Sequence, residues 1–442
     1  MNYLAKSNRA YNLLSFFLVM LILMLSVFIA DSLQTINVSS IVKLLVIITI
    51  FTIYFIFNEI TIIGLLIPFT AIYLRPAKYL YYIMISILLL VFIAKRIYNK
   101  NYKVCLPYFY LFTLIAFFGI IATYRASVLY EGLHNLFTIV ITPMILIFVI
   151  YNSQFSYTKM IKYMRYLVYV ASLVGFLGVI IAITNPTERI GSTWETAMTI
   201  NAFYVFSFFI SLGLAFREKS MIQKYFFYFL SLIILFGMLF TYTRIALLSV
   251  FFGAILLAIR LKEVRKFAIV VLLLVMLFIP ASMVERAGKN IFEDSSVIIR
   301  LFAWVHSFEL IKQNPIFGIG FDTWKNTYEY EVPLYWLYAE HPHNVFIKLL
   351  LELGMIGMTA YFFIVFNIIW RFYKLIRKSK NIEFHLSMIV AIIAILFSCL
   401  TDVFIVKLPI AIIFWIMLAF MLKMTASKDL EVNYEKSPVS NN

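Results

Sequence analysis

Long runs of apolar residues, separated by short polar stretches, repeat along almost the whole chain. A helix that crosses the hydrocarbon core of a bilayer needs about 20 mostly apolar residues, with about 17–25 the usual range. Several runs are short, so the pattern predicts twelve to fourteen membrane-spanning helices, and fourteen is the preferred count. The runs are Leu13–Ala30, Ile41–Phe57, Ile60–Leu74, Tyr79–Ala94, Leu106–Thr123, Leu136–Ile150, Tyr166–Thr184, Ala197–Phe216, Tyr225–Phe240, Ile245–Ile259, Phe267–Met283, Asn344–Ile369, Phe384–Leu400 and Leu408–Leu422.

The composition agrees with this reading of the pattern. Of the 442 residues, 64% are hydrophobic and 13% are charged, whereas soluble domains are about 45–50% apolar and about 25% charged. Ile60–Leu74 is short enough for a re-entrant or broken helix. Leu13–Ala30 lacks the small-residue cleavage site of a signal peptide, so it is interpreted as the first span. The predicted fold class is therefore an all-α, polytopic membrane protein.

The net charge of +16 could suggest a nucleic-acid partner, but the basic residues lie in short loops instead of one stripe. Cytoplasmic loops of membrane proteins collect Lys and Arg. Alternation of the basic loops predicts that both termini are cytoplasmic, with residues 425–442 forming a disordered tail. The basic clusters are Lys6/Arg9, Lys95/Arg96/Lys100/Lys103, Lys159/Lys162/Arg165, Arg217/Lys219/Lys224, Arg260/Lys262/Arg265/Lys266 and Arg371/Lys374/Arg377/Lys378/Lys380.

One long polar stretch, residues 284–343, interrupts the apolar runs and falls on the outer side. It separates an N-terminal helical bundle (1–283) from C-terminal spans (344–424), and it is too aromatic to be disordered. Ser296 to Gln313 contains no Gly or Pro, and Asn314-Pro315 would end a helix there. At helical spacing Arg300 shares a face with Trp304, so this arginine is expected to point toward the membrane-embedded body.

Arg244 is the single charge between Phe226 and Ile259. A lone arginine at a membrane boundary is costly unless it is paired or solvated, which makes it a functional hypothesis. The alternative is that Arg244 only marks the turn of a helical hairpin. The isolated charge by itself favours neither of these two interpretations.

His341 and His343 stand where the long loop re-enters the membrane. Histidine accepts a proton near neutral pH, so His343 is suited to act as a general base on a hydroxyl group. A structural histidine at an interface is the alternative. The pair also suggests a metal site, but no third ligand lies at useful spacing in the sequence, so no metal and no cofactor are predicted.

Basic residues on the outer side run against the usual distribution of charge. An anionic ligand such as a diphosphate would explain them, because arginine binds its oxygens in a bidentate way. Ordinary scatter explains one or two. Glu352 lies four residues after Lys348, which predicts an internal ion pair, and a two-carboxylate site in the loop has weak support. The outward basic residues are Arg75, Lys78, Arg125, Arg189, Arg244 and Arg300.

In six short segments, taken in order, the chain resembles the O-antigen ligase and polymerase family. Each segment is weak evidence alone, but the ordered set is specific and spans roughly Arg189 to Met358. Thr243 stands where the family pattern has serine, and it keeps the hydroxyl. The segments are Arg189-Ile190-Gly191-Ser192, Tyr242-Thr243-Arg244, Arg300 with Trp304, Asn314 to Gly320, His341-Pro342-His343-Asn344, and Glu352 to Gly357.

The resemblance implies a GT-C-type glycosyltransferase bundle in the bacterial inner membrane, with its site at the outer face. It implies a glycan donor on undecaprenyl diphosphate and metal-independent, inverting transfer. By position, Arg244 and Arg300 would bind the diphosphate and His343 would be the base. Further substrate contacts would come from the other outward basic residues and from Trp304, His341 and Asn344.

The acceptor stays open between lipid A-core, as in a ligase, and a second carrier-linked repeat unit, as in a polymerase, with a slight preference for the polymerase. The first alternative function is a transporter or lipid flippase, which should show two similar halves with matching broken helices. No such repeat is visible. A structural assembly protein is the second alternative.

Overall fold

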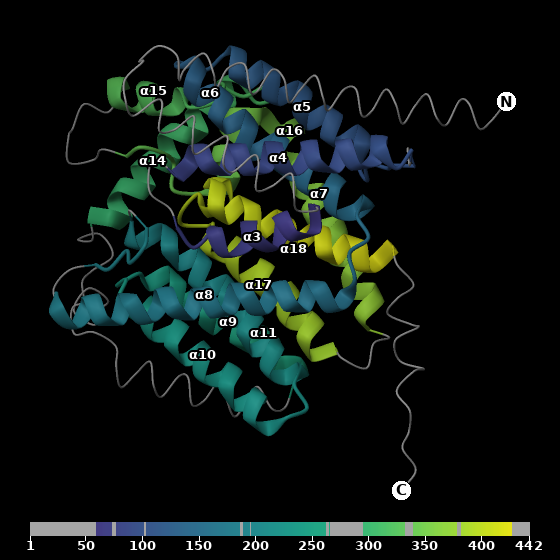
Figure 1. The fold of residues 1–442 in the computed structure, drawn as a ribbon. Helices are drawn as coiled ribbons and strands as arrows, with labels where there is room; N and C mark the ends of the chain where they lie inside the picture. The colour runs from purple at the N-terminus through teal and green to yellow at the C-terminus, as the bar shows by residue number, and fades with distance from the viewer. Residues whose placement is uncertain are drawn as a thin grey trace, which may run out of the picture.

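The computed structural model describes residues 59–72, 77–100, 103–185, 189–194, 196–261, 265, 295–331, 339–377 and 382–426, and all regular secondary structure among them is helical (Figure 1). The predicted spans Leu13–Ala30, Ile41–Phe57 and Phe267–Met283 lie outside these residues. The helices are α3 (Glu59–Phe69), α4 (Ala77–Tyr98), α5 (Phe109–Tyr124), α6 (Leu129–Leu136), the π-helix η1 (Phe137–Ile141), α7 (Thr142–Asn152), α8 (Tyr157–Thr184), α9 (Ala197–Arg217), α10 (Met221–Leu239), α11 (Arg244–Arg260), α14 (Ser295–Gln313), α15 (Thr323–Glu331), α16 (Val345–Ile376), α17 (Ile382–Ser398), the 3₁₀-helix η4 (Phe404–Val406) and α18 (Leu408–Ala426).

Seven of the described helical segments are long and apolar enough to cross a membrane, and three shorter apolar helices accompany them. The protein is therefore an all-helical, polytopic integral membrane protein, as the apolar runs predicted. Within the apolar segment Ile60–Leu74, the described residues form the short helix α3.

Helix boundaries differ from the apolar runs where basic residues adjoin them. The run beginning at Tyr166 belongs to α8, which already begins at Tyr157. The Ser156 hydroxyl caps that helix by accepting the backbone N–H of Lys159 at 3.3 Å. Lys and Arg are good helix formers, so the helix continues through the polar residues. Hydropathy therefore marks the apolar part of this helix and not its first turns.

The core of the bundle forms around α9, whose side chains are almost all buried. This helix packs against α17, α10 and α8, while α18 packs against α7 and α16 packs against α5. The C-terminal helices α17 and α18 thus lie inside the bundle among helices from the first half of the chain (Figure 1). Chemistry-bearing residues at the ends of α16 and α18 are held by this packing.

The bundle has two distinct ends. At one of them, called the basic end, Lys423 donates to the Tyr151 carbonyl at 2.8 Å and Arg260 donates to the Tyr373 hydroxyl at 3.2 Å. These contacts join the last turns of α18 and α16 to the ends of α7 and α11. At the opposite end, called the loop end, α16 and α18 begin, and α14 and α15 lie there (left in Figure 1).

The outer stretch predicted to be helical from Ser296 to Gln313 forms α14, Ser295–Gln313. After it, residues 314–320 dock on α16 where that helix is interrupted at Gly354. The Met355 N–H donates to the Pro315 carbonyl at 2.8 Å, and the Ile319 N–H donates to the Leu351 carbonyl at 2.7 Å. Two of the six segments that carried the family resemblance therefore form one structural joint.

Gly354 is expected to be indispensable to this joint. Its φ of 68° and ψ of 178° lie in a region that essentially only glycine adopts, and a Cβ there would come within 1.9 Å of the Ile316 carbonyl oxygen. Gly354→Ala should therefore destabilise the fold by about 2–4 kcal/mol, from strain and overpacking together. The measurement is thermal unfolding in detergent. Gly178→Ala, whose added Cβ meets nothing closer than 3.6 Å, is the control, and equal melting temperatures would contradict the expectation.

Candidate functional site

The connection between α17 and α18 organises the loop end. Its carbonyl groups bind the segment that carries the two histidines. The Cys399 carbonyl accepts the Val345 N–H at 3.0 Å, and the Leu400 carbonyl accepts the Asn344 side-chain amide at 3.1 Å. The Asn344 oxygen caps α16 by accepting the N–H groups of Phe346 and Ile347. Asn344 thus fixes the start of α16, and substrate binding by it stays a prediction.

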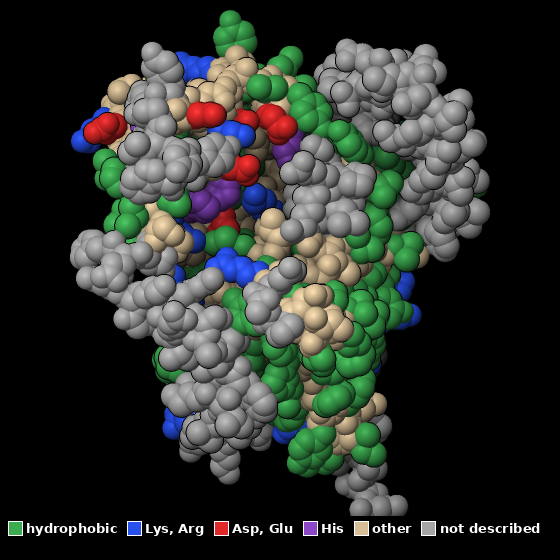
Figure 2. All heavy atoms as spheres, turned by 90° about the vertical axis from the view of Figure 1, so that its left-hand side faces the viewer, with side chains coloured by type: hydrophobic (Ala, Val, Ile, Leu, Met, Phe, Trp, Pro, Cys, Tyr) green, Lys and Arg blue, Asp and Glu red, His purple; other side chains and the backbone are tan. Residues whose placement is uncertain are grey.

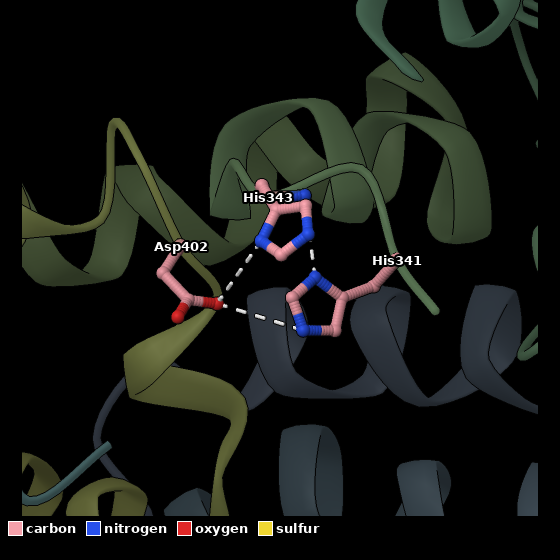
Figure 3. A group of neighbouring side chains, drawn as sticks. All are labelled: His341, His343 and Asp402. Atoms are coloured by element: carbon pink, nitrogen blue, oxygen red, sulfur yellow. Dashed lines mark hydrogen bonds and ion pairs between the residues drawn. The ribbon is translucent and has the colours of Figure 1, made fainter. Parts of the chain in front are cut away.

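Asp402 lies in the same connection and faces both histidines (Figure 3). Its Oδ1 lies 3.6 Å from His341 Nε2 and 4.0 Å from His343 Nδ1. The His343 backbone N–H donates to His341 Nδ1 at 3.3 Å, and the two ring centroids are 4.3 Å apart. The three side chains form one cluster, which we call the His–His–Asp cluster.

This geometry favours one arrangement of the protons in the cluster. Because His341 Nδ1 accepts a hydrogen bond, the proton of its neutral ring is on Nε2, toward Asp402. The carboxylate likewise favours the tautomer of His343 with a proton on Nδ1. His343 Nε2 is then unprotonated. His343 also has a φ of 49°, a strained value for a residue other than glycine and one that recurs at functional sites.

Both imidazole rings are neutral near physiological pH. Burial lowers the pKa of His341 well below its ordinary value, and Lys407 and Lys348 act in the same direction. Burial also lowers the pKa of His343, with Asp402 opposing that shift and with Arg300 and Lys407 adding to it. A neutral imidazole can accept a proton, so His343 is in the state that a general base requires.

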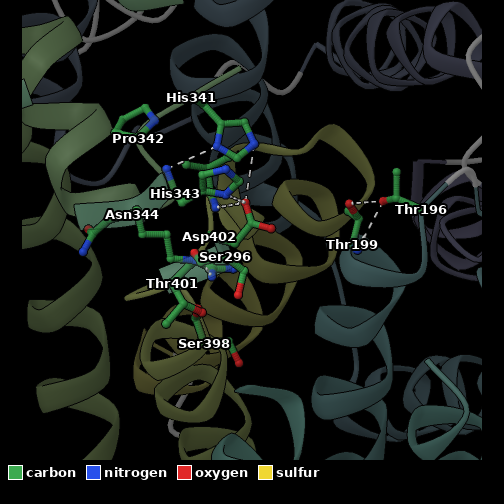
Figure 4. Close-up of polar contacts among 12 residues, drawn as sticks. Thr196, Thr199, Ser296, His341, Pro342, His343, Asn344, Ser398, Thr401 and Asp402 are labelled. Atoms are coloured by element: carbon green, nitrogen blue, oxygen red, sulfur yellow. Dashed lines mark hydrogen bonds and ion pairs between the residues drawn. The ribbon is translucent and has the colours of Figure 1, made fainter. Parts of the chain in front are cut away.

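Arg300 reaches the same connection from α14. Figure 4 shows Thr401 and Asp402 of the connection near His343 and near Ser296 of α14. Its Nε donates to the Thr401 carbonyl at 3.2 Å, and its Nη1 donates to the Ser296 carbonyl at 2.7 Å. On the same helix, Trp304 Nε1 donates to the Pro342 carbonyl at 2.9 Å. The prediction that this face of α14 points toward the membrane-embedded body is confirmed. Trp304 positions the histidine segment, and a direct contact of Trp304 with substrate stays a prediction.

The His–His–Asp cluster meets the first requirement of a metal site, because its three ligand atoms lie within 4.8 Å of one another. The argument that no third ligand is available was therefore wrong, since the fold supplies Asp402 from a distant part of the chain. The surrounding charges nevertheless oppose a bound cation, because Lys407, Lys348 and Arg300 all act on the two rings. Transfer without a metal stays a prediction.

The chain segments that carry Arg244 and Arg189 meet at the loop end, although the two residues are 55 positions apart in the chain. Arg244 begins α11 after Thr243, its N-cap residue. The Ile190 N–H donates to the Phe240 carbonyl at 3.2 Å, which brings the Arg189 segment to the turn between α10 and α11. Arg189 is exposed and Arg244 is partly exposed. Two of the predicted cationic positions thus belong to segments that meet at one turn.

The remaining outward basic residues fall elsewhere. Arg125 Nη1 donates to the Gly318 carbonyl at 2.8 Å, and its guanidinium lies 5.9 Å from the Phe317 ring centroid. Arg125 therefore holds residues 314–320 in place, and substrate binding by it stays a prediction. Arg75 lies outside the described residues, and only the backbone of Lys78 is described, in the first turn of α4.

Charged and histidine side chains gather in a recess on the face that carries α14 and α15 (Figure 2). Apolar side chains surround this recess and cover the rest of the described face below it. A hollow beside His341 is lined by Glu340, Lys348 and Glu352 among others. The site is thus a polar recess at the boundary of an apolar helical bundle.

Sequence reasoning missed Asp402 and Lys407, although a usable signal was present. They are the two charged residues between Glu383 and Lys423, in an otherwise apolar stretch that includes two predicted spans. Ionisable residues within such segments mark functional sites by default. Their distance along the chain from His343 kept them out of the spacing argument.

Comparison with known families supports the resemblance. Residues 229–362 match the family model described as O-antigen ligase. This match supports the resemblance of that region to the O-antigen ligase and polymerase family. The matched region contains Arg244, Arg300, His341 and His343, and it ends before Asp402. No curated protein matches the chain. The family implies an enzyme of the glycosyltransferase type that acts on lipid-linked glycans.

Proposed function

We propose that this protein transfers a glycan from undecaprenyl diphosphate to an acceptor hydroxyl at the outer face of the bacterial cytoplasmic membrane. The single observation that carries the proposal is the convergence of a neutral His343 and the guanidinium of Arg300 on the α17–α18 connection. Both residues belong to the region that matches the O-antigen ligase model.

The residues support a one-step, inverting displacement. His343 Nε2 takes the proton of the acceptor hydroxyl while that oxygen attacks the anomeric carbon of the donor. The bond from the anomeric carbon to the carrier diphosphate breaks, and the diphosphate leaves with the electron pair. Arg300 and Arg244 stabilise the negative charge that develops on it, which is the electrostatic contribution a preorganised site supplies. Asp402 stabilises the imidazolium formed on His343 until the proton is released to water.

The acceptor is either lipid A-core or the glycan of a second carrier-linked repeat unit. Both present a sugar hydroxyl, so the same base and the same cations serve either reaction. We retain the preference for polymerisation of repeat units.

Transfer in vitro tests the function. Purified full-length protein in nanodiscs is incubated with carrier-linked oligosaccharide extracted from the source organism, without any ion gradient. A longer carrier-linked product, or a glycosylated lipid A-core, is the expected result. Movement of the lipid across the bilayer without a new glycosidic bond would instead support a flippase.

The orientation is also open to test. The site should face outward because Lys and Arg of the basic end favour the cytoplasm. Reporter fusions at Lys100, Arg260 and Lys378 should therefore read cytoplasmic, and a fusion at Asp322 should read extracytoplasmic. A cytoplasmic signal at Asp322 would place the site away from its expected donor and would remove the assignment.

Lys407 is expected to set the pKa of the proposed base, His343. Because its positive charge lowers the pKa of His343, Lys407→Met should raise that pKa. The rate falls as pH decreases through the pKa of the base, so the acid limb of the transfer profile should move to higher pH. Lys423→Met, on the same helix but at the basic end, should leave the profile in place. An unmoved profile in the Lys407 variant would show that His343 is not the titrating base.

A further inference from the structure

A hollow lies beside His341, between α15, residues 339–342 and the first two turns of α16. Its free space is about that of one water molecule. The hollow therefore suits a single hydroxyl group at the end of a sugar arm, and not a whole sugar unit or a glycan. Nothing in the proposed transfer step uses this hollow.

Glu352 lines the hollow with an unsatisfied oxygen. The residue is 2% exposed. Its Oε1 accepts Lys348 Nζ at 2.5 Å and the Asp322 N–H at 3.3 Å. Its buried Oε2 has no hydrogen-bond partner among the described residues. An unpaired buried carboxylate oxygen is costly, so the site favours a ligand that donates a hydrogen bond.

Trp324 lines the same hollow with an unsatisfied donor. It is 3% exposed and stacks on Tyr328 with ring centroids 4.6 Å apart. Its Nε1–H has no acceptor within the described part of the chain. Buried indole N–H groups usually find a partner. The residues that line the hollow thus include one unpaired acceptor and one unpaired donor, the two partners that a hydroxyl group needs.

We infer that this hollow is the acceptor subsite, in which a hydroxyl-bearing arm of the acceptor sugar donates to Glu352 Oε2 and accepts from Trp324 Nε1. The inference rests on the proposed function and adds to it the part of the acceptor that is recognised.

The charges assign the acceptor, and not the donor diphosphate, to this hollow. Asp322, Glu340 and Glu352 line it, against Lys325 and Lys348. A diphosphate would meet the unpaired carboxylate oxygen of Glu352, whereas Arg300 and Lys407 provide a cationic surface elsewhere around the histidines. His341 lines the hollow and contacts His343, so a sugar held here lies beside the proposed base.

Two conservative variants test the subsite. Trp324→Phe keeps an aromatic ring but removes the N–H, and Glu352→Gln keeps the shape but removes the charge. Each should raise the acceptor KM by about threefold to tenfold, the value of one hydrogen bond, with the donor KM unchanged. The matched controls are Trp370→Phe on α16 near the basic end and Glu329→Gln on the exposed side of α15. Equal acceptor KM values in variants and controls would overturn the inference.

Deoxygenated acceptors identify the hydroxyl. The soluble repeat-unit oligosaccharide of the source organism is used with a set of synthetic analogues, each lacking one hydroxyl. With the wild-type protein, one analogue should raise the acceptor KM by the same factor as Trp324→Phe does. With the Trp324→Phe variant, that analogue should raise the acceptor KM no further, as expected for two partners of one contact. If every analogue raises the acceptor KM by the same factor in the wild-type protein and in the variant, the hollow holds water only and the inference is wrong.

Direct binding separates this inference from the proposed function. Saturation-transfer NMR reports contact of the same soluble oligosaccharide with the full-length protein without any reaction. One outcome is that the wild-type protein binds the oligosaccharide but forms no glycosidic bond, and that Trp324→Phe weakens this binding. This outcome would contradict the transferase proposal and support the subsite. Transfer that both variants leave unchanged would contradict the subsite alone, and neither binding nor transfer would contradict both.

Discussion

His343→Ala should lose most of the transfer activity while leaving membrane insertion and donor binding intact. A general base contributes about 10²–10⁴-fold to a rate, and no other neutral imidazole in the described cluster has both Asp402 at Nδ1 and a free Nε2. The turnover rate should therefore fall by about that factor, with the donor KM little changed. Transfer rates at matched protein levels, together with donor binding, provide the measurement.

The other histidines supply graded controls. His341→Ala should be much milder, because one base suffices, although its ring helps to place the His343 backbone. His306→Ala should change the turnover rate less still, since His306 lies away from the face of Arg300 and its ring contacts Trp324 and Tyr328 and not the proposed base. Each variant is assayed with and without a chelator. An inactive His341 variant together with chelator sensitivity would replace the lone base with a metal site at the His–His–Asp cluster, and the mechanism would be abandoned.

Much of the fold followed from periodicity and composition, because a lipid environment restricts spanning segments to helices whose side chains are apolar. Runs such as Ala197–Phe216 and Leu408–Leu422 correspond closely to α9 and α18. The helix in the outer stretch was also predictable, since Ser296 to Gln313 lacks breakers and Asn314-Pro315 follows. Likewise the spacing of Lys348 and Glu352 predicted the observed ion pair.

What periodicity could not give was the meeting of segments far apart in the chain. Asp402 belongs to the site only because α16 and α18 both begin at the loop end, which tertiary packing decides. Arg125 shows a second limit of sequence reasoning. Its predicted position on the outer side suggested a phosphate ligand, but nothing in the sequence indicated that its Nη1 donates a hydrogen bond to the Gly318 carbonyl. Charge and sidedness can nominate a residue, but they do not identify its partner.

The diphosphate clamp is expected to require guanidinium groups and not merely positive charge. Arg300→Lys and Arg244→Lys retain the charge, but an ammonium cannot reproduce the planar fork that binds two oxygens at once. Losing one charge-assisted hydrogen bond costs about 1.5–3 kcal/mol, so each variant should lower kcat/KM for the donor by about 10- to 150-fold. In addition, Arg300→Lys loses the contact of Nε with the Thr401 carbonyl.

A stability control is therefore needed to separate binding from folding. Arg260→Lys, at the basic end, makes the same chemical change where Arg260 contacts the Tyr373 hydroxyl, and it should leave transfer unchanged. Thermal unfolding of all three variants shows whether any loss of rate follows a loss of structure. Full activity in both Arg244→Lys and Arg300→Lys, at normal expression, would rule out a bidentate role. Loss confined to Arg300→Lys with a matching fall in melting temperature would reduce that arginine to a support for the α17–α18 connection, leaving Arg244 and its neighbour Arg189 as the residues that bind the diphosphate.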